Sequence, residues 1–151
     1  RWQPSRRMVL NDRILLLPNC SVKCDRNILL PKSQLVRDVW NLLHTSNLAK
    51  ASEIMLNSAK IAIDNCTDEK HDETKIAEVL DAMSLLKGID PLYLQKIDVK
   101  SLECFWINLY HCTLAVGAVT IGLTSQKLKP LLRFYNNVSV FVGNQPWSLS
   151  D

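Results

Sequence analysis

The sequence predicts a mainly α-helical fold with a small β element (α+β), in which helices pack round a buried central helix. Three observations favour this class: successive segments with apolar residues at helical spacing, a long apolar stretch in the second half, and a short alternating run near the end. Hydrophobic residues make up 47% and charged residues 22% of the 151 residues. These values are typical of one globular domain with a sizeable core and not of a disordered or fibrous chain.

Three amphipathic helices are expected after residue 32. In the first, which follows Ser33, the apolar residues between Leu35 and Leu43 lie on one stripe. The second should run from Asn47 to Ile63. The third carries the helical pattern from Ile76 to Leu86 and should end at Gly88, because glycine commonly terminates helices.

A short helix and then the central helix should follow. Asp90 is placed to cap the short helix, with Pro91 at its first position. The stretch from Leu102 to Leu123 is the most apolar part of the chain, and we expect a buried helix from about Ser101 to Val119. We do not expect a transmembrane segment there, because three polar side chains inside the stretch would be costly in lipid: Glu103, Asn108 and His111.

The end of the chain should hold a short helix and a strand. Residues from Ser125 to Tyr135 predict a helix interrupted at Pro130. The alternating β-branched run from Val138 to Val142 predicts a strand, and Gly143-Asn144 predicts the turn after it.

Residues 1–31 predict an extended basic arm or hairpin in front of a helical domain at 32–151. Two short apolar runs, at 14–17 and 28–30, favour extended structure. Residues 1–37 hold eight basic and two acidic residues, a balance that suits an anionic membrane surface or an acidic partner. Trp2 is the only aromatic residue among them before the first helix, so we do not expect nucleic-acid binding.

The cysteine count favours a reducing compartment. Five cysteines are an odd number, and no cleavable signal peptide precedes them, so we expect a cytoplasmic protein. Three glycosylation sequons keep secretion open as an alternative: Asn19, Asn65 and Asn137.

Two segments carry a family resemblance. Cys104 to His111, Cys-Phe-Trp-Ile-Asn-Leu-Tyr-His, is similar to the Phe-Trp-Ile-Asn-x-Tyr-Asn signature of the domain-of-unknown-function family 547. Val138 to Asp151 resembles that family's strand, glycine turn and Ser-Leu-x-Asp element. The resemblance covers residues 102 to 151 and implies a helical body with a small sheet. It implies no activity, and it departs from the family at His111, where the signature has Asn.

The same resemblance predicts that the domain is incomplete at its C-terminus. The family continues beyond the position of Asp151 into an Ile-Glu-His-Gly element and a later segment that contains cysteine. We therefore expect the partner of this domain to be another protein or the remainder of the same polypeptide.

Cys104 is the candidate nucleophile. Its place near a helix start, before aromatic residues, resembles in outline the nucleophile position of papain-like and transglutaminase-like enzymes, since a helix N-terminus lowers the pKa of a thiol. His111 follows seven residues later on the same helix, about 10 Å away by helical rise, which is too far for a general base. We therefore expect a buried structural thiol at Cys104.

Cys20 and Cys24 could supply two zinc ligands, with His111 and Cys112 as a second pair. Adjacent residues on a helix point about 100° apart, so the second pair is poorly arranged. We expect no metal and no other cofactor.

Asn108 is expected to be buried and hydrogen-bonded, tying the central helix to a neighbouring loop. The candidate binding residues lie in the two motifs: Trp106, Asn108, Tyr110, His111 and Trp147. The favoured function is a non-catalytic scaffold or protein-protein interaction module within a larger intracellular protein. The alternatives are a thiol-dependent hydrolase or transferase that uses Cys104, and anionic-surface binding through the basic arm.

Overall fold

The computed structural model describes residues 8–11, 33–64, 73–121 and 135–151, and these form mainly α-helices with a small sheet, as predicted. The elements in chain order are β1 (Met8–Val9), α2 (Gln34–His44), α3 (Leu48–Asp64), α4 (Glu73–Ser84), the 3-10 helix η2 (Leu85–Gly88), α5 (Pro91–Leu94), α6 (Val99–Ile121), β2 (Val138–Val142) and β3 (Gln145–Ser148).

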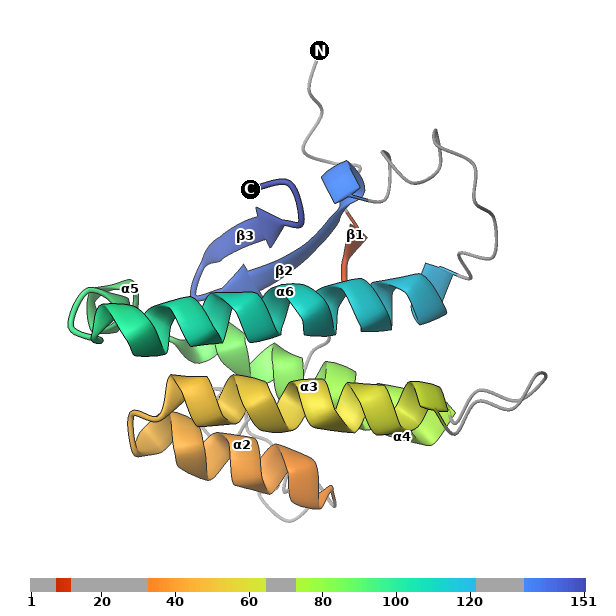
Figure 1. The fold of residues 1–151 in the computed structure, drawn as a ribbon, viewed down its shortest axis with the longest axis horizontal. Coiled ribbons are helices and arrows are strands. Elements are labelled where there is room, and N and C mark those ends of the chain that lie inside the picture. Colours follow the sequence, from red (N-terminus) through yellow and green to blue (C-terminus); the bar gives the residue numbers. More distant parts are fainter. Residues whose placement is uncertain (1–7, 12–32, 65–72, 122–134) are drawn as a thin grey trace, which may run out of the picture.

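Helix α6 runs across the middle of the molecule. Figure 1 shows the sheet on one side of α6 and the helices α3, α4 and α2 on the other. The helix packs most extensively against α3 and also touches β2 and α4. This arrangement leaves α6 between a helical layer and a sheet layer, which is the central position that its apolar sequence predicted.

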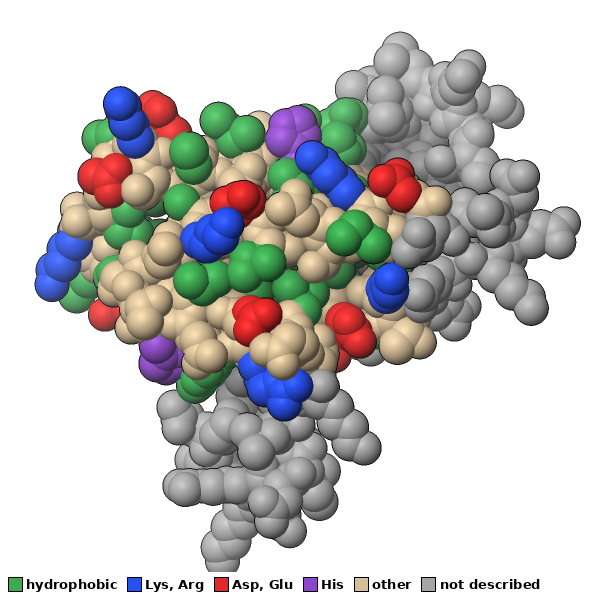
Figure 2. All heavy atoms as spheres, turned by 60° about the horizontal axis from the view of Figure 1, so that its bottom comes forward, with side chains coloured by type: hydrophobic (Ala, Val, Ile, Leu, Met, Phe, Trp, Pro, Cys, Tyr) green, Lys and Arg blue, Asp and Glu red, His purple; other side chains and the backbone are tan. Residues whose placement is uncertain are grey.

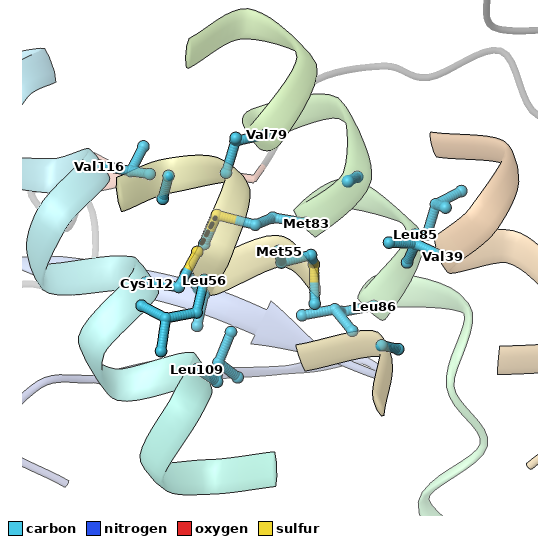
Figure 3. Packing of buried hydrophobic residues seen from close by; sticks show 14 of the residues in the cluster. Val39, Met55, Leu56, Val79, Met83, Leu85, Leu86, Leu109, Cys112 and Val116 are labelled. Atoms are coloured by element: carbon cyan, nitrogen blue, oxygen red, sulfur yellow. Dashed lines mark hydrogen bonds between the residues drawn. The ribbon is translucent and has the colours of Figure 1, made fainter. Parts of the chain in front are cut away.

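The core lies between α6 and the helical layer. Phe105, Leu109, Cys112 and Val116 recur at helical spacing on one side of α6 and are buried. They meet buried side chains of α3 and α4, among them the sulfur contact between Met83 and Cys112 at 3.8 Å, which Figure 3 shows inside the cluster. This stripe is therefore the face of α6 that packs on the helical layer, mainly on α3.

By length and composition alone, the stretch Val99–Thr120 could cross a membrane, a test that core helices of other proteins also pass. In this fold α6 lies between two protein layers, and part of its circumference is open: Glu103, Ile107 and His111 are exposed.

The sheet has the strand order β1-β2-β3, with β1 parallel and β3 antiparallel to β2. Gly143 makes the turn between β2 and β3 with a φ of 62°, and a Cβ at that position would lie 2.8 Å from the carbonyl oxygen of Ile89. Its N–H donates to the Leu86 carbonyl at 2.8 Å. Glycine is required at this turn both by the backbone conformation and by the close approach of the Ile89 carbonyl.

The predicted helices are confirmed at α2, α3, α4 and α6, with bounds within a few residues of expectation. Asp90 caps α5 as predicted, because its Oδ1 accepts from the Leu92 N–H at 2.9 Å. The turn at Gly88 is a 3-10 helix that continues α4. Of the expected helix from Ser125 to Tyr135, only Tyr135 is described, and it is helical; the rest of it and the apolar runs at 14–17 and 28–30 lie outside the described residues.

Two strands were not predicted from the sequence. Strand β3 contains Pro146, which argues against a strand unless it lies at an edge, as it does here. Strand β1 has only two residues, and Leu10 extends its pairing by donating to the Ser139 carbonyl at 2.9 Å. Met8–Asn11 is therefore part of the folded body, with Leu10 and Asn11 buried.

Candidate functional site

A groove of about 350 Å³ lies between α6 and the strands β2 and β3. Its lining is mainly apolar and aromatic and comes from two distant parts of the chain: Trp106, Leu109, Tyr110, Thr113, Val140, Trp147, Ser148, Leu149 and Asp151. We call this hollow the α6–β3 groove. Its volume and its lining are typical of a recognition site and not of a packing defect.

Trp106 and Trp147 form the aromatic wall of the groove. Their ring centroids lie 5.0 Å apart with the planes inclined at 57°, and Trp106 also meets Phe105 edge-on at 5.1 Å. Both tryptophans are half-buried. The two motifs that carry the family resemblance thus meet at one site, and both tryptophans are among the binding residues predicted from the sequence.

Tyr110 lies on the same side of α6, one turn after Trp106, and is 38% exposed. Partial desolvation raises the pKa of the Tyr110 phenol, and Tyr135 beside it acts in the same direction. The phenol therefore stays neutral at ordinary pH, and its hydroxyl also hydrogen-bonds to the Tyr135 side chain. This third predicted binding residue also lies in the groove.

The segment from Ser148 to Asp151 closes the groove as a hydrogen-bonded turn. Asp151 Oδ2 accepts from the backbone N–H of Ser148 at 2.6 Å and from its hydroxyl at 2.8 Å. The Asp151 N–H donates to the Ser148 carbonyl at 3.2 Å. The serine and aspartate of the Ser-Leu-x-Asp element thus have a structural role, because they fold the chain back beside Trp147.

This turn also blocks the outer edge of β3. The backbone N–H and C=O of Phe141 both hydrogen-bond to Asn11 and therefore point away from β3. Phe141 and its cross-strand neighbour Pro146 are thus a non-hydrogen-bonded pair, and the backbone groups of Pro146 point to the outer edge of β3. Proline has no N–H, and the outward N–H of Ser148 is held by Asp151. Strand addition at β3 is therefore disfavoured, and a ligand of the groove must use the side chains.

Thr113 supplies a polar group that the sequence analysis missed. It is 1% exposed, it lines the groove, and its hydroxyl has no hydrogen-bond partner among the described residues. Thr120, two helical turns further along α6, instead donates to the Val116 carbonyl at 2.7 Å. An unpaired buried hydroxyl is costly, and a groove ligand with a hydrogen-bonding atom would relieve that cost.

Asn108 and His111 do not join the groove. Asn108 is half-buried and donates through Nδ2 to the Ser52 hydroxyl of α3 at 3.2 Å. We expected Asn108 to bond to a neighbouring loop, and this is wrong, because its amide links α6 to another helix, α3. His111 is exposed, and its ring meets Tyr110 edge-on at 5.5 Å.

The expectation of a buried thiol at Cys104 is wrong, because Cys104 is exposed. It lies in the second turn of α6, beyond the first four residues whose N–H groups lack helical partners. Of the two described thiols, the buried one is Cys112, which shares the core face with Phe105 and Leu109. Only one face of this apolar helix is buried, and Cys104 lies on another face.

Burial raises the pKa of Cys112 to about 12. A metal binds the thiolate, so this thiol is a poor zinc ligand, and it does not pair with the exposed His111. Cys20 and Cys24 lie outside the described residues. Within the described part of the chain no cluster of three or more His, Cys, Asp or Glu could hold a metal ion.

The basic arm also lies mostly outside the described residues. On the side of the molecule that carries α2 and α3, Figure 2 shows acidic and basic side chains of the described residues interspersed. This face does not concentrate one sign of charge, as an electrostatic membrane-binding surface would.

No family model, no curated protein and no solved structure matches this chain. The resemblance to family 547 therefore stays a prediction, based on the two motifs that meet at Trp106 and Trp147.

Proposed function

We propose that this domain is a non-catalytic scaffold and protein-interaction module of a larger intracellular protein. The observation that carries the proposal is the α6–β3 groove, an aromatic-walled hollow with a buried hydroxyl that has no partner among the described residues. Aromatic residues concentrate binding energy at protein interfaces because they bury a large area at a small cost in conformational entropy.

The partner is a protein segment, either from another chain or from the remainder of the same polypeptide. It packs an apolar side chain against the paired rings of Trp106 and Trp147 and places a hydrogen-bonding atom within reach of Thr113. Ile107, 57% exposed and one turn before Tyr110, extends the apolar surface along α6. The blocked edge of β3 argues against a partner that adds a strand.

Site-specific photo-crosslinking in the native cell tests the proposal. A photoreactive phenylalanine replaces Tyr110 in the groove, and the matched control replaces exposed Lys60 of α3, on the other side of α6. We expect the label at position 110 to crosslink one defined protein segment, and Trp147→Ala to abolish that product while the domain stays folded. Equal and diffuse crosslinking from both positions would exclude the groove as the docking surface.

Thr113→Val provides a second readout on the same segment. Valine has nearly the shape of threonine but lacks the hydroxyl, so it should leave the free domain at least as stable as before. Once the crosslinked segment is known, its affinity for Thr113→Val should fall about fivefold to tenfold. Unchanged affinity would show that the partner does not use this hydroxyl, and the assignment of the groove contacts would be wrong.

A further inference from the structure

A second hollow, of about 440 Å³, lies where the turn between α2 and α3 meets the segment from η2 to α5. Its floor is apolar and comes from Leu43, Leu48, Leu85 and Ile89. Leu48, Leu85 and Ile89 are buried, so the floor belongs to the folded core and is built whether or not a ligand is bound. We call this hollow the α2–α5 pocket.

Three polar side chains around the α2–α5 pocket can accept a hydrogen bond: His44, Asp90 and Tyr93. His44 Nδ1 lies 2.8 Å from the Trp40 carbonyl oxygen, which can only accept, so Nδ1 carries the proton and Nε2 of the neutral ring keeps its lone pair. Asp90 uses Oδ1 to cap α5 and brings a full negative charge with its second oxygen. The Tyr93 hydroxyl oxygen is buried and has no partner among the described residues.

The electrostatic surroundings favour a cation. Among the described residues, the lining includes one carboxylate and no lysine or arginine. The last turn of α2 brings the negative end of a helix dipole and Leu48, the first residue of α3, brings a positive end, so the helix ends favour neither sign and the charge of Asp90 decides. The Trp40 ring, held against His44 at a centroid distance of 4.1 Å, and the Tyr93 ring offer π-faces to a positive charge.

From this combination we propose that the α2–α5 pocket binds an organic ammonium ion with an apolar body, that is, an aryl- or alkylamine. The apolar body covers the leucine floor. The ammonium donates to the Asp90 carboxylate, to the Tyr93 hydroxyl oxygen and to His44 Nε2. This site is distinct from the α6–β3 groove, and it does not depend on the function proposed for that groove.

Titration by ¹H–¹⁵N NMR tests the chemistry with three ligands of similar shape and different charge. We expect 2-phenylethylamine, protonated at pH 7, to shift the Trp40 indole resonance. The neutral 2-phenylethanol should bind about tenfold more weakly, because it loses the charge-assisted hydrogen bonds, and phenylacetate should not bind. Equal affinity for the amine and the alcohol, or no shift with about 10 mM amine, would overturn the proposal.

Two variants locate the site. Asp90→Asn preserves the helix cap, because asparagine caps as well as aspartate, but it removes the charge, so affinity for the amine should fall about tenfold. The control is Asp64→Asn, which removes the same charge at the far end of the 17-residue α3, about 24 Å from Leu48 by helical rise. Equal affinities of the two variants would reject the site. Tyr93→Phe should also weaken amine binding, with the NMR spectrum of each variant verifying its fold.

One more ligand distinguishes a free amine from a lysine side chain as the source of the ammonium. Nα-acetyl-lysine N-methylamide presents the lysine side chain alone. If it binds more tightly than 2-phenylethylamine and loses affinity with Asp90→Asn, the natural ligand is a lysine on a protein. If 2-phenylethylamine binds more tightly, the ligand is a small free amine.

Discussion

The side-chain amide of Asn11 hydrogen-bonds with both backbone polar groups of Phe141. Its Oδ1 accepts from the Phe141 N–H at 2.7 Å, and its Nδ2 donates to the Phe141 carbonyl at 2.8 Å. The same Nδ2 donates to the carbonyl of Met83 in α4 at 2.9 Å. The Asn11 side chain thus makes the hydrogen bonds to β2 that the backbone of β1 would make if the strand continued. It also links the sheet to the helical layer through Met83.

Asn11→Ala should therefore destabilise the domain strongly. The substitution leaves three backbone groups near the core without their partner, and each unsatisfied buried group costs about 1 to 3 kcal/mol. We expect a loss of about 3 to 5 kcal/mol in the free energy of unfolding, measured by urea denaturation. Asn57→Ala, at an exposed position of α3, is the matched control and should change stability by less than about 0.5 kcal/mol. Similar effects of the two variants would contradict the role of Asn11.

The sequence predicted the helices because each carries its own periodic signal. The bounds of α2 and α3 follow from apolar spacing, and Asp90 and Pro91 predict α5 by their local chemistry. Asn11 carried no such signal, since its burial depends on contacts with Met83 and Phe141 far along the chain. Strand β1 is equally hidden, because two residues cannot show an alternation.

The candidate site could be predicted in part for the same reason. Trp106, Tyr110 and Trp147 were chosen for residue type and motif, and the fold brings them together. Cys104 was misplaced because an apolar stretch does not show which face is buried until a neighbour is known. Thr113 was missed because its signal is the absence of a hydrogen bond, which no sequence pattern records.

The two tryptophans of the groove should stabilise each other. Trp106→Ala should cost about 2 kcal/mol, below the about 3 to 5 kcal/mol of a fully buried site, because Trp106 is half-exposed. A double-mutant cycle with Trp147→Ala should give a coupling energy of about 0.5 to 1.5 kcal/mol, typical of an aromatic pair. Additive losses would show that the rings do not interact in solution.

The two described thiols should differ in reactivity. Cys104 is exposed, whereas Cys112 is buried in the core and has a raised pKa. We expect iodoacetamide at pH 8 to alkylate Cys104 in the native protein and to leave Cys112 unmodified until the chain unfolds. Peptide mass spectrometry after timed quenching gives both rates. Comparable labelling of both thiols in the native state would mean that the core around Met83 is open.

The buried thiol of Cys112 should also make the stability of the domain depend on pH. Its pKa is raised from 9.0 to about 12 by burial, so between these values the unfolded chain loses the thiol proton while the folded protein keeps it. The unfolded state then binds fewer protons, and the free energy of unfolding falls as pH rises, by about 1.4 kcal/mol per pH unit at most from this group. Between pH 8 and pH 10.5, under reducing conditions, wild type should lose about 2 kcal/mol more than Cys112→Ala, which has no thiol to titrate at this position. Cys104→Ala is the matched control and should keep the wild-type slope, since its thiol is exposed in both states. Parallel slopes for wild type and Cys112→Ala would show that the buried position of Cys112 is wrong, and with it the helical phase of α6 against α4.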